Sequence, residues 1–412
     1  MLVNDAGQNK TKKIKLAIWI LLTLTYICIE PFLSQIVVIY CYNILYIPYT
    51  IIKEVFPILI IAFFIIFTIK RKSEVHFGVI IYIAIAYIIY LLASIVNRTD
   101  ISIWETIVVS AFAECIIIMP ICVNKDNLKL FIKICTVLYT ILATVNIIFK
   151  ISPNLYDIVC GYQVETFLTG WDNMTGFPLM MGLFFALLNR YYNNGKINLV
   201  IYVIIYIINQ YLMWSATALV SATILLMFVI LPIKKICGKC NFIVYIACIL
   251  IVFILLVFIW GNLSEIEPLK FFVETVLKKD MTLTGRVEIW SGVWNLIKEK
   301  LLLGHGLTEN TAMYYDTGYN WNWVHAHNLF LQTWYEGGIL TLLACFAVLI
   351  MTAFKMNKCQ NAELMGIFKI TIFAMLVNYQ ADQFIVHPWL SGCWAGIFFI
   401  CNFAAVVAEN DS

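Results

Sequence analysis

The chain has little charge. Charged residues make up 12% of its 412 residues, about half the roughly 25% that is usual in soluble domains. Lysine and arginine outnumber aspartate and glutamate by only three, so the net charge indicates no polyanionic partner such as a nucleic acid. Hydrophobic residues make up 62% of the chain, which is more than a soluble core of this length can use. These proportions exclude a water-soluble enzyme, a nucleic-acid-binding protein and a disordered scaffold.

The hydrophobic residues also lack the alternation with polar residues that marks the strands of a membrane barrel. Only helices and closed barrels satisfy their backbone groups in lipid, so the continuous runs predict an all-α fold. At roughly 20 residues a crossing, we expect a polytopic membrane protein with about 12 transmembrane helices, forming one domain over residues 1–412. The runs lie near residues 16–38, 54–69, 77–96, 102–122, 131–149, 173–189, 197–213, 215–233, 241–261, 328–354, 364–380 and 388–408.

Basic residues set the orientation of such a protein. Lys10, Lys12, Lys13 and Lys15 precede the first run, which places the N-terminus in the cytoplasm. An even number of crossings returns the C-terminus to the same side, and most loop cations then also fall inside. These are Lys70, Arg71, Lys72, Lys125, Lys129, Arg190, Lys196, Lys234, Lys235, Lys239, Lys355 and Lys358. The prediction is a multi-pass membrane protein with both termini cytoplasmic.

The cysteines give no sign of a metal site. Most of the 13 lie inside apolar runs, where cysteine behaves as a small apolar residue. Cys237 and Cys240 form the only Cys-x-x-Cys pair, and without a second pair they do not predict a zinc site. We expect neither a metal nor a cofactor.

One connection, residues 262–327, is long, and the predicted orientation places it outside, between the ninth and tenth spans. Apolar residues recur in it at spacings of three and four, which predicts an amphipathic helix lying in the membrane interface. Arg286 falls on the same face, in the first turn, where free N–H groups and the helix dipole favour an anion. The alternative is an arginine that extends to lipid headgroups. The stripe consists of Ile289, Trp290, Val293, Trp294 and Ile297.

Three of the five histidines belong to this connection. His305 stands between two glycines, which favours a structural turn over a role in binding. His325 and His327 lack a third ligand at a recognisable spacing, so a metal is the less favoured interpretation. At the outer surface, a histidine such as His327 can instead take a proton near neutral pH, or it can simply hydrogen-bond across the loop. Asn328 follows at the entry to the tenth span.

Polar and aromatic residues on the outer side complete the candidate site. Asp172 and Asn173 stand at the entry to the sixth span, where they can line an outer cleft or be ordinary interface residues. Trp323 ends a segment rich in tyrosine and tryptophan that begins at Tyr314. Such rings suit stacking on sugar faces and also suit anchoring at a membrane interface.

Three segments together resemble the signature of the O-antigen ligase and O-antigen polymerase superfamily of the bacterial inner membrane. They are Gly285-Arg-Val-Glu-Ile-Trp290, Leu303-Gly-His-Gly306 and His327-Asn-Leu-Phe-Leu-Gln-Thr-Trp-Tyr-Glu-Gly337. The resemblance implies a membrane glycosyltransferase with a GT-C-like fold, whose donor is an oligosaccharide on undecaprenyl diphosphate. It also implies that chain-length regulator and flippase proteins are possible partners, beside the membrane lipid.

Carried over residue by residue, the resemblance makes His327 the catalytic histidine, with Asn328 supporting it. Arg286 would contact the diphosphate or its glycan, and Asp172 with Asn173 would match the family's asparagine-containing entry to a mid-chain span. One departure is a missing second arginine. Family members often carry it after a Ser or Thr near the start of the span at 215–233, where this chain has Trp214-Ser-Ala-Thr. Arg98 or Lys278 with Lys279 are candidates to replace it.

The leading hypothesis is therefore a repeat-unit polymerase for a capsular or O-antigen type polysaccharide. A ligase that passes the finished glycan to a different acceptor uses the same donor, and the sequence does not separate the two. From another class, a secondary transporter or lipid-linked oligosaccharide flippase also suits twelve spans. It is less favoured because the candidate residues gather at the outer surface rather than at the bilayer midplane.

Overall fold

The computed structural model describes residues 46–70, 77–152, 154–155, 167–169, 175–260, 266–276, 280–283, 285–307, 325–381 and 392–410, together with Trp19 and Leu21. The regular secondary structure of these residues is helical throughout, which confirms the all-α prediction. Its first half consists of α3 (Tyr46–Thr50), η2 (Ile51–Val55), α4 (Phe56–Lys70), α5 (Gly78–Val96), α6 (Ile101–Ile116), α7 (Met119–Cys122), α8 (Lys125–Ile151), α10 (Gly176–Asn193) and α11 (Lys196–Met213). The second half consists of α12 (Ala216–Ile230), α13 (Lys234–Lys239), α14 (Phe242–Ile254), η4 (Leu255–Ile259), α16 (Glu267–Phe271), η5 (Phe272–Val276), α17 (Arg286–Glu299), α19 (Leu329–Lys358), α20 (Ala362–Asn378) and α21 (Gly392–Asn410).

The helices have the length and composition of membrane spans. Among the described residues, α5, α8, α11, α19 and the continuous α14–η4 helix are long and apolar enough to cross a membrane. Each predicted run from 54–69 onward coincides with a described helix or pair of helices. The first run, 16–38, lies outside the described residues except for Trp19 and Leu21. The polytopic helical fold is thus confirmed, and the number of twelve crossings stays a prediction.

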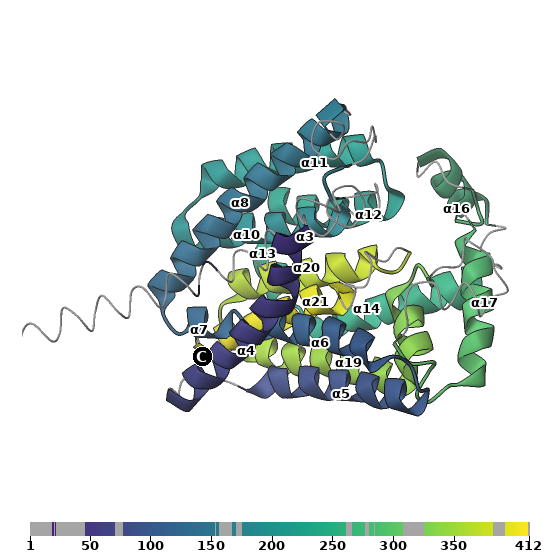
Figure 1. Ribbon diagram of the computed structural model, residues 1–412. Coiled ribbons are helices and arrows are strands. Elements are labelled where there is room, and N and C mark those ends of the chain that lie inside the picture. The colour runs from purple at the N-terminus through teal and green to yellow at the C-terminus, as the bar shows by residue number, and fades with distance from the viewer. Residues whose placement is uncertain are drawn as a thin grey trace, which may run out of the picture.

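The centre of the bundle is formed by α10, α20 and α21, whose described side chains are nearly all buried. Phe184, Phe368 and Phe403, one from each helix, have ring centroids 5.2 to 6.1 Å apart. The helices α8 and α11 lie on one side of this centre, and α5 and α6 lie on the other (Figure 1). Outer helices expose isoleucine and leucine, for example Ile85 of α5 at 43%, as expected of surfaces that face lipid rather than water.

Several cations lie at the helix ends on one side of the bundle. Lys355 and Lys358 end α19, and α20 starts four residues later. Lys125 starts α8, Arg190 lies in the last turn of α10 and Lys196 starts α11. We call this the basic end. α17 lies across the opposite end, on the right of Figure 1, near the start of α19.

α19 is broken at Gly338, whose φ of 71° and ψ of −179° are not helical. The segment Leu301–Gly306, here called the strap, lies along the break. His305 and Gly306 donate their N–H groups to the carbonyls of Tyr335 and Glu336 at 2.7 and 2.8 Å, and Ile339 N–H donates to Leu301 at 2.9 Å. These bonds satisfy backbone groups that the interrupted helix would otherwise leave unpaired.

The strap fits only because glycine occupies its tightest positions. A Cβ atom on Gly338 would lie 2.1 Å from the Leu302 carbonyl oxygen, and one on Gly304 would lie 2.4 Å from the Tyr335 oxygen. The strap is also tied to the end of α5, because Asn97 Nδ2 donates to the Gly304 carbonyl at 2.9 Å. The strap, which follows α17 in the chain, therefore connects α17 with α5 and α19.

Candidate functional site

The site centres on the short segment His325–Asn328 that enters α19. Ala326, in the middle of this segment, has both its backbone carbonyl and its backbone N–H hydrogen-bonded to side chains. Trp290 Nε1 of α17 donates to the Ala326 carbonyl at 3.0 Å, and Ala326 N–H donates to Gln332 Oε1 of α19 at 2.8 Å. Because Trp290 and Ala326 are fully buried, these two bonds fix the backbone between the histidines.

The Arg286 guanidinium lies within electrostatic range of this segment. Arg286 starts α17 after Gly285, which takes the left-handed conformation with φ of 80°. Arg286 and Trp290 are four residues apart and so share a helix face. The pKa of His325 is well below its usual value because burial disfavours the charged ring, and the nearby His327 and the Arg286 guanidinium lower it further. The guanidinium is thus within electrostatic reach of the histidines, and His325 is neutral near pH 7.

The two imidazoles lie against each other, with ring centroids 3.8 Å apart and planes inclined by 46°. The backbone N–H of His327 donates to Nδ1 of His325 at 3.2 Å. Since Nδ1 of His325 accepts this bond, the neutral ring carries its proton on Nε2. His325 is therefore arranged as a hydrogen-bond donor, with no lone pair left to accept a proton.

His327 takes a strained backbone conformation, with φ of 47°. Strain of this kind persists only where neighbours fix the chain, and it is enriched at functional sites. Asn328, which is fully buried, holds the backbone of His327 in this conformation. Its Oδ1 accepts from the N–H groups of Phe330 and Leu331, and its Nδ2 donates to the Gln380 carbonyl at 2.7 Å. This geometry makes Asn328 a helix cap that orients His327, rather than a group open to a ligand.

Two polar residues of α19 have a role that the sequence analysis did not identify. Gln332 Nε2 donates to Glu336 Oε1 at 2.8 Å, which turns its other end, Oε1, toward Ala326. Asn328, Gln332 and Glu336 recur every fourth residue of an otherwise apolar helix. This spacing could have been recognised in the sequence, because polar side chains in a membrane span are energetically costly and usually mark a functional site.

His305 lies further from Arg286. It stacks on Tyr335 with centroids 4.6 Å apart, and its Nε2 is 3.1 Å from the Leu296 carbonyl of α17. Leu296 is ten residues from Arg286, about 15 Å along the helix axis. This contact suits the structural turn expected for His305. Asp172, Asn173 and Trp323 lie outside the described residues.

The predicted amphipathic helix corresponds to α17, but its apolar stripe faces the protein and not lipid. Its stripe is buried inside the protein, with exposed fractions of 0 to 3% for Ile289, Trp290, Val293 and Ile297. Trp294 packs on Trp334 of α19 and Phe258 of η4, with centroids 5.1 and 5.0 Å apart. Helical periodicity identifies an apolar face and does not say whether protein or lipid covers it.

Of the residues expected to replace the missing second arginine, the structure describes only Arg98. Arg98 is exposed just after α5, next to Asn97, which binds the strap. Lys278 and Lys279 lie outside the described residues. No group of three His, Cys, Asp or Glu side chains that could hold a metal occurs in the described part of the chain.

The fold and the site together define a polytopic helical membrane protein with an arginine and two histidines at one end of the bundle. Residues 197–346 match the model of a family described as O-antigen ligase. The matched segment runs from α11 into α19 and contains Arg286, the strap and the His325–Asn328 segment. This match confirms the resemblance to the ligase and polymerase superfamily.

The family supports a glycan-transferring membrane enzyme that acts on lipid-linked glycans. No curated protein and no solved structure matches the chain.

Proposed function

We propose that the protein is a polysaccharide repeat-unit polymerase of the bacterial plasma membrane. It transfers glycan from undecaprenyl diphosphate to a sugar hydroxyl of another lipid-linked glycan. The observation that carries this proposal is the electrostatic effect of the Arg286 guanidinium on His325, whose ring lies against that of His327, within the segment that matches the family. The site lies at the end of the bundle opposite the basic end, which supports a location at the outer membrane face.

In the proposed reaction His327 is the general base. It takes the proton of the acceptor hydroxyl as the oxygen attacks the anomeric carbon of the donor. The bond from that carbon to the diphosphate oxygen breaks, and the electron pair leaves on undecaprenyl diphosphate. A well-placed base of this kind supplies roughly 10²- to 10⁴-fold in rate.

Arg286 and His325 have a different role in this proposal, because both are donors. The guanidinium can bind two diphosphate oxygens through parallel charge-assisted bonds. The Nε2–H group of neutral His325 can donate to a further oxygen. Both contacts strengthen as negative charge builds on the leaving group, which is the condition for accelerating the transfer.

Purified protein supplied with lipid-linked repeat units tests the proposal. Wild type should make longer glycans, and His327→Ala should lower the elongation rate by about 10²-fold or more. Arg286→Ala should also lower it, whereas Lys298→Ala, which removes a cation from the far end of α17, should not. Unchanged elongation in both His327→Ala and Arg286→Ala would remove these residues from the mechanism.

A deletion strain separates the polymerase from the ligase of the same family. Loss of a polymerase should leave lipid-linked glycans of a single repeat. Loss of a ligase should leave long lipid-linked chains instead, and that outcome would contradict the proposed function while keeping the same donor chemistry.

A further inference from the structure

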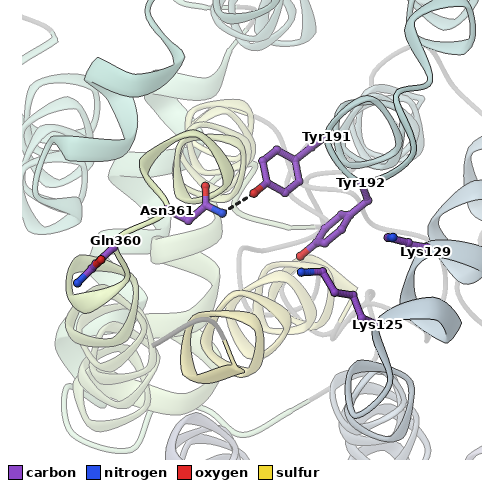
Figure 2. A pocket seen from close by; sticks show the side chains of 6 residues that line it. All are labelled: Lys125, Lys129, Tyr191, Tyr192, Gln360 and Asn361. Carbon is purple, nitrogen blue, oxygen red and sulfur yellow. Dashed lines mark hydrogen bonds between the residues drawn. The ribbon is translucent and has the colours of Figure 1, made fainter.

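A cavity of about 680 Å³ opens at the basic end, far from the histidines. It lies between three helix ends, namely the start of α8, the end of α10 and the turn from α19 to α20. Figure 2 shows Lys125, Lys129 and Tyr192 pointing toward one another, and Asn361 hydrogen-bonded to Tyr191. Gln360 completes the lining.

The lining presents hydrogen-bond donors and positive charge. Two ammonium groups, two phenol hydroxyls and two amides line the cavity, and none of the six residues is acidic. Neither lysine pairs with a carboxylate of the described residues. Asn361 Nδ2 donates to the hydroxyl oxygen of Tyr191, so the phenol's own hydrogen is left to donate elsewhere. Such a set of groups suits an anion with several acceptor oxygens.

The position of the lysines also argues for an anion. Lys125 is the first residue of α8, a helix of 27 residues, and Lys129 lies one turn later. The N-terminus of a helix carries a partial positive charge, so cations there are unfavourable unless an anion offsets them. Acidic residues would be the usual choice in this turn. Of the first helical residues only Asp126 is acidic, and it does not line the cavity.

The faces of α8 indicate where the anion comes from. Leu130, Val137 and Ile141 form an exposed apolar stripe on α8, with exposed fractions of 45 to 52%. Leu128, Phe131 and Cys135 form the buried stripe on the opposite side. At 3.6 residues per turn, Lys125 and Lys129 lie between the two stripes. The cavity therefore sits where the lipid-facing surface meets the packed core, at the level of the helix ends.

We propose that this cavity binds the phosphate headgroup of an anionic membrane lipid. Basic pockets between transmembrane helices near the cytoplasmic surface are suited to such headgroups. The lysines would hold the phosphate charge, and Tyr191 with Asn361 would donate to its oxygens. The acyl chains would then lie along the exposed stripe of α8. This site is separate from the transfer reaction and does not depend on it.

Native mass spectrometry of the full-length protein tests the proposal, with phosphatidylglycerol and phosphatidylcholine as the probes. Wild type should retain phosphatidylglycerol in preference to phosphatidylcholine. The double variant Lys125→Ala with Lys129→Ala should weaken phosphatidylglycerol binding by roughly tenfold or more. Lys133→Ala, which removes an exposed lysine one turn further along α8, should leave binding near the wild-type level.

Three results would overturn the assignment. One is equal retention of the two lipids by wild type, and another is an equal loss from Lys133→Ala and the double variant. The third comes from a competition with inorganic phosphate. Complete displacement of phosphatidylglycerol by inorganic phosphate would assign the cavity to a soluble phosphate group instead of a lipid.

Discussion

At the scale of single residues, the two histidines differ in what their nitrogen atoms can do. His325 accepts from the His327 backbone through Nδ1 and keeps its proton on Nε2. His327 is turned by a left-handed backbone and held by the cap residue Asn328. The sequence predicted that this pair and Arg286 belong to one site. It could not assign the role of His325 as a donor, because the tautomer of His325 depends on a bond formed only in the folded segment.

The neutral state of His325 has a consequence for stability. Its pKa is lowered in the folded protein, chiefly by burial, while a histidine in the unfolded chain titrates near 6.5. Below about pH 6.5 the unfolded state therefore binds more protons than the folded state, and the free energy of unfolding falls as acid is added. Wild type should lose thermal stability between about pH 7.5 and 5.5 more steeply than His325→Gln. Equal slopes in a thermal unfolding assay would contradict this account of His325.

At the scale of elements, α17 and α19 are locked together through backbone groups rather than through apolar packing alone. Apolar spacing predicted that α17 is a helix. The break in α19 was not predictable from local sequence, because it depends on the strap, a segment about 30 residues earlier in the chain. The sequence identifies Gly304, Gly306 and Gly338 individually as turn residues. It does not show that the strap with Gly304 and Gly306 packs against the break at Gly338, because that is a tertiary contact.

The indole of Trp290 links α17 to the His325–Asn328 segment through its bond to the Ala326 carbonyl. Trp290→Phe keeps the ring packing and removes the donor to the buried Ala326 carbonyl, at a cost of about 1–3 kcal/mol. The freed peptide should misplace His327, so kcat for elongation should fall by roughly tenfold with KM little changed.

Trp294→Phe provides the matched control on the same helix, because Trp294 lies away from Ala326 and packs on other aromatic rings. Its kcat should stay within about twofold of wild type. An equal fall in kcat for both variants would show that Trp290 contributes only packing.

The break in α19 should tolerate no side chain at Gly338. Its φ and ψ fall in a region used almost only by glycine, and a Cβ atom would overlap the strap. Gly338→Ala should lower the free energy of unfolding by about 3 kcal/mol or more. Gly285→Ala also has a positive φ but meets no atom within 4 Å, so it should cost about 1–2 kcal/mol. Thermal shifts of equal size would refute the role given to the strap.

At the scale of the whole molecule, the cavity with its lysines and the candidate site lie at opposite ends of the bundle. The start of α8 with Lys125 and the end of α19 with Lys358 lie at one end, and α17 lies across the other (Figure 1). Composition and run length predicted the helical membrane fold. They could not show that α10, α20 and α21 form the buried centre, since a helix that faces protein is as apolar as one that faces lipid.

The separation predicts opposite accessibility of the two ends in cells. Glu299→Cys on α17 should react with a membrane-impermeant maleimide added to intact cells, and Lys358→Cys at the end of α19 should react only after the membrane is opened. Both positions are exposed, and the parent protein gives the background from its own cysteines. Labelling of Lys358→Cys alone in intact cells would invert the proposed orientation.

The central claim is that Arg286 and the histidine pair form one transfer site in which His327 is the base and His325 is a donor. The most direct test is the elongation rate of His327→Gln beside that of His325→Gln, measured with purified protein and lipid-linked repeat units. A glutamine amide can replace the Nε2–H donor of His325 but cannot take a proton. The account therefore predicts a loss of about 10²-fold or more for His327→Gln and less than about tenfold for His325→Gln. The reverse order, or equal rates in both variants, would contradict it.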